Sequence, residues 1–353
     1  MIRKLSLENF RNYKKTEVEI NSDLVLVLGN NAAGKTNLIE SLYYLSNLKS
    51  FRTSDNFLVK SGEDYFKVAG AFDGHKAEAV VQINPVVRRG YKIDDQKLRR
   101  LNWNTFRTVL FEPSDLEMFV LGPGSRRKYL NQTLSQKSKV YAADLASLDH
   151  VLKQKSALLG EIQKGTADVS GLDFWNEQLA DAGLRLSKTR REYLDYIQNK
   201  FENIYRSITG FGSQFRIVYK GAESNLNTNE YLNLINSYRD AEVRSGQNLI
   251  GPHRDDFTIT KDGYLNTDNS SRGELRSQTL TIKLIQAEYL SEDDKRPVIL
   301  LDDVFSELDE VRRTRLIESL KDHQIFITST EEHHLPKLSS SAQIIRVDNG
   351  QIK

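Results

Sequence analysis

The stretch LVLVLGNNAAGKTNLIE, residues 24–40, places glycines, small residues and one lysine between a strand-like run and a helix-like run. Its spacing, Gly29-x-x-x-x-Gly34-Lys35-Thr36, is that of a phosphate-binding loop. Backbone N–H groups of residues 30–36 can surround a β-phosphate, and the positive end of the following helix adds to the attraction. We therefore predict that ATP binds to Gly29, Asn30, Asn31, Ala32, Ala33, Gly34, Lys35 and Thr36.

Each part of this loop has a chemical role. Glycine at positions 29 and 34 permits backbone angles and close approaches that other residues resist. Lys35 is predicted to neutralise the β- and γ-phosphates and to be catalytic, and the Thr36 hydroxyl is predicted to bind Mg²⁺. An ordinary glycine-rich turn is the alternative, but a strand before the loop and a helix from about Thr36 to Leu48 are both indicated by the apolar pattern.

A phosphate loop also needs a carboxylate for its metal ion. The run VILLDD supplies four apolar residues followed by Asp302 and Asp303. The apolar residues predict a buried strand, which we expect beside the loop strand. Asp302 would then hold Mg²⁺, directly or through water, and Asp303 would orient the attacking water. The alternative is an acidic turn after a core strand, which the presence of the loop disfavours.

A third candidate site lies at Ser271-Arg272-Gly273-Glu274, where a long helix is predicted to begin and to continue to Leu290. A serine and a glycine at a helix N-terminus can form a second anion site. Taken alone, the same pattern is a common helix cap.

The remaining pattern places these residues on an α/β framework. Residues 1–110 are predicted to be mainly strands, and strands return with SQFRIVYKG, DFTITKDGYLN and HQIFITST. Between them, about residues 125–208 show helical spacing, with two long helices joined by the turn GTADVSG. These helices form either a projecting antiparallel hairpin or a pair packed on the body.

The length of 353 residues favours two domains. We expect an ATPase lobe of residues 1–120 and 291–353, and a second lobe of residues 121–290 that holds a helical arm, about 132–208, and the Ser271 motif. The chain has no cysteine, which excludes disulfides and thiolate metal sites. No apolar run approaches the roughly 20 residues needed to span a bilayer, so we expect no membrane partner and a cytoplasmic protein.

The net charge of +2 leaves room for nucleic-acid binding through a local basic patch. The leading candidate is VVRRGYKIDDQKLRRLNWNTFR, residues 86–107, in which basic residues outnumber Asp94 and Asp95. The alternative for this segment is a solvated β-meander face. A second candidate surface is the helical arm, with the basic residues Arg185, Lys188, Arg190 and Arg191.

The order of the motifs resembles the layout of ATP-binding-cassette (ABC) ATPases. The resemblance implies an ABC-type P-loop ATPase head with a second, largely helical lobe. It also implies that Ser271, Gly273 and Glu274 contact the γ-phosphate held by the other subunit of an ATP-dependent homodimer. The stretch Ser306-Glu307-Leu308-Asp309 resembles the D-loop of the dimer interface. HQIFITST resembles the strand that carries the switch residue, which is here Thr328, Ser329 or Thr330.

Four stretches spread over nearly the full length resemble the RecF family of bacterial recombination mediators. They are LENFRNY, FEPSDLEMFVLGPGSRRKYLN, GPHRDDF and LLDDVFSELDEVRRTRL. The resemblance implies a weak, DNA-stimulated ATPase whose ATP-bound dimer binds single-strand/double-strand junctions and gapped DNA. It further implies RecA loading together with RecR and RecO, support of the SOS response, and slow hydrolysis that acts as a timer.

Two other classes share parts of this layout. A structural-maintenance (SMC) ATPase inserts coiled coils of hundreds of residues, and the insertion here is far shorter. A transporter ATPase subunit needs a membrane partner and usually reads Leu-Ser-Gly-Gly-Gln, where this chain has Ser270-Ser271-Arg272-Gly273-Glu274.

Overall fold

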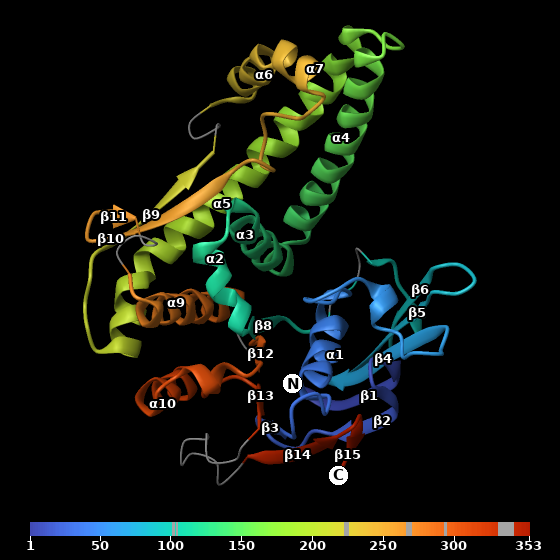
Figure 1. Cartoon of the computed structure of the whole chain (residues 1–353), viewed down its shortest axis with the longest axis vertical. Helices are drawn as coiled ribbons and strands as arrows, with labels where there is room; N and C mark the ends of the chain where they lie inside the picture. The colour runs from blue at the N-terminus through green and yellow to red at the C-terminus, as the bar shows by residue number, and fades with distance from the viewer. Residues whose placement is uncertain (101–102, 104, 222–225, 266–269, 293–294, 331–341) are drawn as a thin grey trace. The chain divides into compact units, whose positions relative to one another are not determined.

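The computed structural model describes residues 1–100, 103, 105–221, 226–265, 270–292, 295–330 and 342–353. The chain divides into two compact units, coloured along the sequence in Figure 1. Unit 1 comprises Met1–Asp115, Ser207–Thr209 and Thr279–Lys353, and unit 2 comprises Leu116–Arg206 and Gly210–Gln278. Among the described residues, no helix combines the length and the apolar character that crossing a membrane requires.

Unit 1 opens with an antiparallel sheet in the strand order β2-β1-β4-β5-β6-β7. Its strands are β1 (Ile2–Phe10), β2 (Tyr13–Glu19), β4 (Tyr65–Phe72), β5 (His75–Gln82), β6 (Arg88–Ile93) and β7 (Gln96–Lys97). In β1, Leu5 and Leu7 are buried while Lys4 is exposed, which is the alternation of a sheet with one solvated face. The prediction that residues 1–110 are mainly strands is confirmed by this sheet.

The second sheet of unit 1 has the order β15-β14-β3-β13-β12-β8. Its strands are β3 (Leu24–Leu28), β8 (Thr108–Phe111), β12 (Val298–Leu301), β13 (Ile325–Ser329), β14 (Gln343–Asp348) and β15 (Gln351–Ile352). All neighbours are parallel except β14 and β15. The expectation that the Val298–Leu301 strand lies beside the loop strand is wrong, because β13 pairs with both and separates them. An apolar run in the sequence indicates that a strand is buried, but it does not indicate which strand lies beside it in the sheet.

Helix α1 (Lys35–Asn47) shares one hydrophobic core with strands of both sheets. Its apolar residues Leu38, Ile39, Leu42 and Leu45 are buried. Unit 1 also holds the 3-10 turns η1 (Asp55–Phe57) and η5 (Val304–Glu307) and helix α10 (Glu310–Ser319). A further 3-10 turn, η3 (Pro113–Leu116), follows β8.

Unit 2 is mainly helical. Its elements include α2 (Glu117–Val120), α3 (Pro123–Lys137), α4 (Lys139–Gln163), η4 (Val169–Gly171), α5 (Leu172–Thr209), α6 (Thr228–Ser237) and α7 (Arg239–Ser245). The predicted antiparallel pair is confirmed as α4 and α5 (Figure 1). The Arg185 guanidinium lies 2.9 Å from the Asp144 carboxylate, and the rings of His150 and Trp175 lie 6.0 Å apart farther along the pair.

A small antiparallel sheet, β9 (Phe215–Lys220), β10 (Asp256–Lys261) and β11 (Tyr264–Leu265), packs on α5. Gln198 on α5 donates to the Phe215 carbonyl at 2.9 Å and accepts from the Ile217 N–H at 2.7 Å, so its amide continues the hydrogen bonding of the sheet. Helix α9 (Arg272–Leu290) follows, close to the predicted start and end.

Our first prediction concerns the ion pair of Lys155 on α4 with Glu242 on α7, whose side chains are fully buried and lie 2.7 Å apart. Lys155→Met should lower the free energy of unfolding by about 3–5 kcal/mol, because it leaves a buried carboxylate without its partner. Lys155→Met/Glu242→Gln should recover most of the loss, since the glutamine oxygen can still accept from the Leu249 N–H. Urea unfolding checks this; equal midpoints for the single and double variants would contradict it.

Candidate nucleotide site

The phosphate loop joins β3 to α1 and contains two left-handed residues. The φ angles are 63° at Ala32 and 122° at Gly34. A Cβ at Gly34 would lie 2.7 Å from the Asn12 amide nitrogen, and a Cβ at Gly29 would lie 2.3 Å from the Val347 carbonyl oxygen. Atoms of the chain itself therefore require glycine at both ends of the loop.

The carbonyl groups of the loop are held from outside. The Asn12 amide donates to the Ala33 carbonyl at 2.9 Å, and the Gly350 N–H donates to the same oxygen at 2.9 Å. The Tyr13 hydroxyl donates to the Gly34 carbonyl at 3.0 Å. These contacts fix the loop while the N–H groups of the first turn of α1, which lack partners within a helix, remain suited to an anion. Apart from the resemblance of LENFRNY to a family stretch, no sequence pattern predicted these contacts.

Lys35 folds back into the loop. Its ammonium group donates to the carbonyls of Gly29 at 2.8 Å and Asn30 at 3.0 Å. Burial lowers the pKa of Lys35, and the nearby charges of Asp303 and Asp302 oppose that change. The positive charge is thus held within the loop that is predicted to bind the phosphates.

A hydrogen-bonded chain connects the loop to the ends of β12 and β13. The Thr36 hydroxyl and the Thr328 hydroxyl both donate to Asp302 Oδ1, each at 2.9 Å. Burial raises the pKa of Asp302, and the two threonine hydrogen bonds act against that rise. The structure therefore brings together the two residues predicted to bind the metal, Thr36 and Asp302, although they are distant in sequence.

This pair of oxygens fits Mg²⁺. The ion prefers octahedral oxygen ligands at about 2.0–2.1 Å, so two neighbouring ligands lie about 2.9 Å apart. The measured separation of Thr36 Oγ1 and Asp302 Oδ1 is 2.9 Å. Within the described part of the chain, no group of three or more His, Cys, Asp or Glu residues could hold a metal. Phosphate oxygens and water would have to supply the other ligands of such an ion.

Asp303 occupies a special backbone position, with φ of 52° and an exposed side chain. Its N–H donates to Thr328 Oγ1 at 2.9 Å, and its carbonyl accepts from the Ser306 hydroxyl at 2.7 Å. Both ends of the residue are therefore fixed while the carboxylate faces solvent. Asp303 also lines a cleft over the phosphate loop.

A cleft of about 270 Å³ lies over the loop. It is lined by Asn31, Ala32, Gly34, Lys35, Thr36, Asn37, Arg52, Asp303 and Thr328. Of the three switch candidates, Thr328 is the one in this cleft. Ser329 is buried in β13, and Thr330 is exposed after the strand.

Arg52 is a cleft residue that sequence reasoning missed. Its Nη2 donates to Glu40 Oε2 at 2.6 Å and to Asn37 Oδ1 at 2.7 Å. Arg11 binds the same Glu40 carboxylate with two hydrogen bonds of 2.8 Å. Glu40 is fully buried and faces two guanidinium groups. Its single negative charge balances only one of them, so the group as a whole carries one net positive charge, and Arg52 is the member that lines the cleft.

The pKa of Glu40 reflects this arrangement. Burial alone would raise the pKa, but hydrogen bonds from Arg11, Arg52 and Ser50 lower it below its ordinary value. Glu40 is thus a charged anchor inside the core. No sequence pattern singled it out, because an acidic residue on a helix is usually exposed.

The third predicted group lies in unit 2, at the start of α9. The Glu274 N–H donates to Ser271 Oγ at 3.3 Å, and Glu274 Oε2 accepts from the Ser271 N–H at 2.8 Å. Lys261 forms an ion pair with Glu274, which lowers the pKa of that carboxyl. A Cβ at Gly273 would meet no atom within 4 Å. The serine is exposed, and nothing in its own chain demands a glycine two residues later.

The two predicted DNA surfaces differ in whether their basic side chains are exposed and free of ion pairs with described residues. In the segment 86–107, Arg89 pairs with Asp55 and Lys92 with Glu78, while Arg88, Lys97 and Arg99 are exposed and form no ion pair with a described residue. On the helical arm, Arg190 is only 1% exposed and pairs with Asp255. Arg190 therefore cannot bind DNA on the surface, and Arg185 is paired with Asp144 and Asp181.

Comparison with known proteins gives one consistent result. The family model described as RecF/RecN/SMC N terminal domain matches residues 1–353. A protein of Caldanaerobacter subterraneus subsp. tengcongensis named "DNA replication and repair protein RecF" is 33% identical, covering 94% of each chain. A protein of the same name from Clostridium tetani is 33% identical over 99% of this chain and 98% of its own.

Solved structures agree with these relatives. The "recombination mediator protein RecF-ATPrS in RecFOR pathway" is similar with a TM-score of 0.92 at 31% identity, covering 100% of this chain and 97% of that one. An Smc head bound to the C-winged helix domain of ScpA is similar with a TM-score of 0.56 at 14% identity, covering 100% and 96%. The second likeness shows a shared fold alone, and both support the predicted α/β ATPase head.

Our second prediction concerns pH. Since the pKa of Glu40 is lowered in the folded state, its contribution to stability is full above the unfolded value, about pH 4.3, and is lost as pH falls through the folded pKa. Glu40→Gln should lower the urea midpoint at neutral pH and flatten its decline below about pH 4.5. Glu17→Gln, which removes an exposed pair with Lys4, is the control and should change little. If the urea midpoint of Glu40→Gln fell with decreasing pH as steeply as that of the parent, Glu40 would not be a charged residue that stabilises the fold.

Proposed function

The chain belongs to the RecF family, and from this premise we propose that it is an ATP-dependent DNA-binding ATPase of recombinational DNA repair and replication. The observation that carries the proposal is the hydrogen-bonded chain Thr36–Asp302–Thr328 beside a braced phosphate loop. A relative described with ATP in the RecFOR pathway, similar at a TM-score of 0.90, supports ATP as the nucleotide.

In this proposal, the loop from Gly29 to Thr36 binds the triphosphate, with Lys35 against the β- and γ-phosphates. Thr36 and Asp302 hold Mg²⁺, which when bound withdraws charge from the phosphate oxygens. Asp303 orients the attacking water, because its fixed backbone leaves the carboxylate directed to solvent at the cleft. Arg52 lines the cleft, and because it shares the Glu40 carboxylate with Arg11, its positive charge is only partly neutralised and can bind a phosphate oxygen.

The second half of the site is proposed to come from another copy of the chain. Ser271, Gly273 and Glu274 lie in unit 2, at the N-terminus of a helix of 19 residues. An exposed serine and the open space at Gly273 suit the approach of a phosphate from outside the chain. ATP would then hold two copies together, and ADP, which lacks the γ-phosphate, would not.

The finer parts of the function follow the family. We propose that the ATP-bound dimer binds single-strand/double-strand junctions and gapped DNA, is stimulated by DNA to hydrolyse ATP slowly, and loads RecA with RecR and RecO in the cytoplasm, in support of the SOS response. The exposed Arg88, Lys97 and Arg99 support a DNA surface on unit 1. SMC heads share the fold, but α4 and α5, with 25 and 38 residues, are short against coiled coils of hundreds of residues.

Our third prediction tests hydrolysis. Asp303→Asn should bind ATP with nearly parental affinity but hydrolyse it about 10²-fold more slowly, because the group that orients water is lost. The ATP-bound dimer should persist longer in size-exclusion chromatography. Asp322→Asn, a change at an exposed carboxylate of the same unit, should leave turnover unchanged. Parental turnover in Asp303→Asn would assign the role to another residue.

Our fourth prediction tests the shared site and with it the proposed function. Ser271→Arg should leave ATP binding by the monomer nearly intact while blocking dimerisation and hydrolysis. The new side chain would occupy the space in which the γ-phosphate of ATP bound to another copy is proposed to lie. Lys35→Met should instead lose ATP binding. Light scattering with ATP, ADP and no nucleotide, with and without gapped DNA, measures dimerisation, and an equilibrium titration with ATP measures nucleotide binding by each variant.

A matched control separates this result from misfolding. Ser237→Arg places the same side chain at an exposed serine on α6, in the same unit, and should dimerise like the parent. Thermal unfolding should show that Ser271→Arg remains folded. If Ser271→Arg dimerises with ATP as the parent does, Ser271 is only a helix cap.

A further inference from the structure

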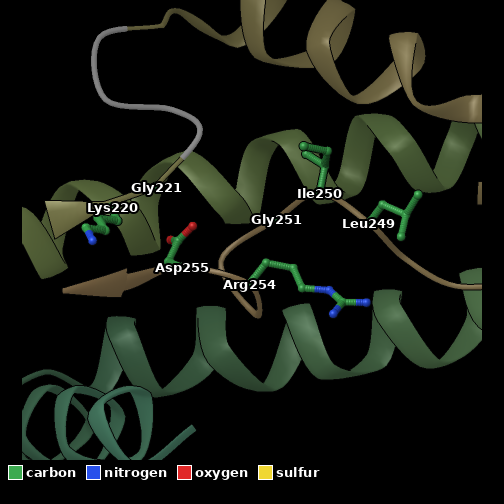
Figure 2. A pocket seen from close by; sticks show the side chains of 7 residues that line it. All are labelled: Lys220, Gly221, Leu249, Ile250, Gly251, Arg254 and Asp255. Atoms are coloured by element: carbon green, nitrogen blue, oxygen red, sulfur yellow. The ribbon is translucent and has the colours of Figure 1, made fainter. Parts of the chain in front are cut away.

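The cleft over the phosphate loop and a cavity in unit 2 differ in how their arginine side chains are held. The cavity, of about 220 Å³, lies where the loop 249–255 passes the end of β9 (Figure 2). Its two cations, Lys220 and Arg254, extend in opposite directions with the Asp255 carboxylate between them. In the cleft of unit 1, by contrast, neighbouring side chains hold the guanidinium of Arg52 by several hydrogen bonds. The direction of this arginine is therefore set by the fold.

Two acceptors on α1 fix the plane of the Arg52 guanidinium. Its Nη2 donates to Glu40 Oε2 at 2.6 Å and to Asn37 Oδ1 at 2.7 Å, so both N–H groups of this nitrogen are used. Its Nε donates to Glu40 Oε1 at 3.4 Å. Nη1 forms no hydrogen bond with a residue that the structure describes, which leaves it available to a ligand in the cleft. Glu40 supplies the charge that holds the arginine, and Asn37 supplies a second direction that limits rotation about that contact.

The Asn37 amide also connects Arg52 to the phosphate loop. Asn37 Nδ2 donates to Asn12 Oδ1 at 2.9 Å, and Asn12 Nδ2 donates to the Ala33 carbonyl at 2.9 Å. A guanidinium can only donate and a carbonyl can only accept, so the two ends determine which way both amides face. The hydrogen bonds therefore form one directed chain, in which two amides join the guanidinium to the Ala33 carbonyl.

The far end of this chain is the peptide unit that joins Ala33 to Gly34. In a trans peptide the N–H and the C=O point in opposite directions, so the Gly34 N–H faces away from the Asn12 amide. This N–H is one of the groups of residues 30–36 that are predicted to surround a phosphate. A phosphate that accepted from it would make the Ala33 carbonyl a better acceptor, because hydrogen bonds in a chain strengthen one another. Phosphate binding and the orientation of Arg52 would thus be linked.

We propose that Asn37 is a positioning residue for ATP hydrolysis, which holds Arg52 for contact with a phosphate oxygen and joins that arginine to the phosphate loop. The inference rests on the proposed ATPase function and adds a residue to it. Without Asn37, the Gly350 N–H and the Tyr13 hydroxyl would still hold the carbonyls of the loop. Loss of the Asn37 amide should therefore slow the reaction rather than weaken ATP binding.

The test measures steady-state ATP hydrolysis by the full chain in the presence of gapped DNA. Arg52→Ala should lower kcat about 10²-fold, the usual cost of removing one donor to a transition state. Asn37→Ala should lower kcat about tenfold and leave KM for ATP within about twofold, because Arg52 remains but can rotate. Added to Arg52→Ala, the Asn37→Ala change should cost less than about twofold more, since no arginine is left to position.

A matched control removes an amide from the same helix. Asn47 on α1 is also half-buried, and its amide donates to the Tyr43 carbonyl at 3.1 Å and to the Thr108 hydroxyl at 2.9 Å. Asn47→Ala should keep the parental kcat and KM. Thermal unfolding should show that the Asn37→Ala and Asn47→Ala variants are both folded.

A second variant tests the amide chain with little change of shape. Asn37→Asp can still accept from Arg52, but it cannot donate to Asn12. It should therefore also lower kcat, whereas a parental kcat would show that the connection to the phosphate loop is not needed.

A spectroscopic measurement follows the chain without turnover. The side-chain N–H signals of Asn12, assigned by their loss in Asn12→Asp, should shift in Arg52→Ala, although two hydrogen bonds separate these residues. The same signals should not shift in Asn47→Ala. Unshifted signals in Arg52→Ala would overturn the connection between the arginine and the loop.

The kinetic outcomes separate this inference from the proposed function. A parent that hydrolyses ATP while Asn37→Ala keeps the parental kcat would overturn the inference and leave the proposed function standing. Equal losses from Asn37→Ala with and without Arg52 would also overturn it, because Asn37 would then act independently of the arginine. A parent that does not hydrolyse ATP would overturn the proposed function itself.

Discussion

The candidate nucleotide site depends on one desolvated carboxylate held by two threonine hydroxyls. Asp302 is 7% exposed, and the hydrogen bonds from Thr36 and Thr328 offset the cost of burying its charge. The strand order makes the contact possible. Because β13 lies between β3 and β12, Thr328 reaches both Asp302 and the N–H of Asp303. If β12 paired directly with β3, no strand would present a hydroxyl between the loop and the carboxylate.

A second set of contacts balances the charges around this carboxylate. Two cations, Lys35 and Arg52, and two carboxylates, Asp302 and Asp303, meet at or beside the cleft. Glu40 anchors Arg52 from the core, and Arg11 on the turn between β1 and β2 binds the same Glu40 carboxylate. The next two residues, Asn12 of that turn and Tyr13 at the start of β2, hold the carbonyls of the phosphate loop. One short turn therefore connects the position of the phosphate loop to the position of the arginine.

The parts of the site that sequence analysis predicted are those encoded locally. The loop spacing, the start of α1 and the acidic end of the β12 strand are each contained within a few residues. The contacts that it missed join residues far apart in sequence, such as Asn12 to Ala33 and Arg52 to Glu40, and no periodicity encodes them. Arg190 shows the converse error. Its basic neighbours on α5 resemble a solvated face, but a carboxylate that folding brings from residue 255 draws it into the interior.

The two interpretations of Ser271, helix cap and partner contact, are chemically compatible. A serine hydroxyl has one donor and two acceptor sites. In the structure, Ser271 Oγ uses an acceptor site for the Glu274 N–H, and a hydrogen bond from the Ser271 side chain is one of the causes of the lowered pKa of the Glu274 carboxyl. Lys261 and the Ser271 N–H hold the Glu274 carboxylate, so the negative charge of Glu274 is partly offset. The cap therefore orients the hydroxyl, whose proton would turn from the Glu274 carboxylate to a γ-phosphate that arrived from another copy.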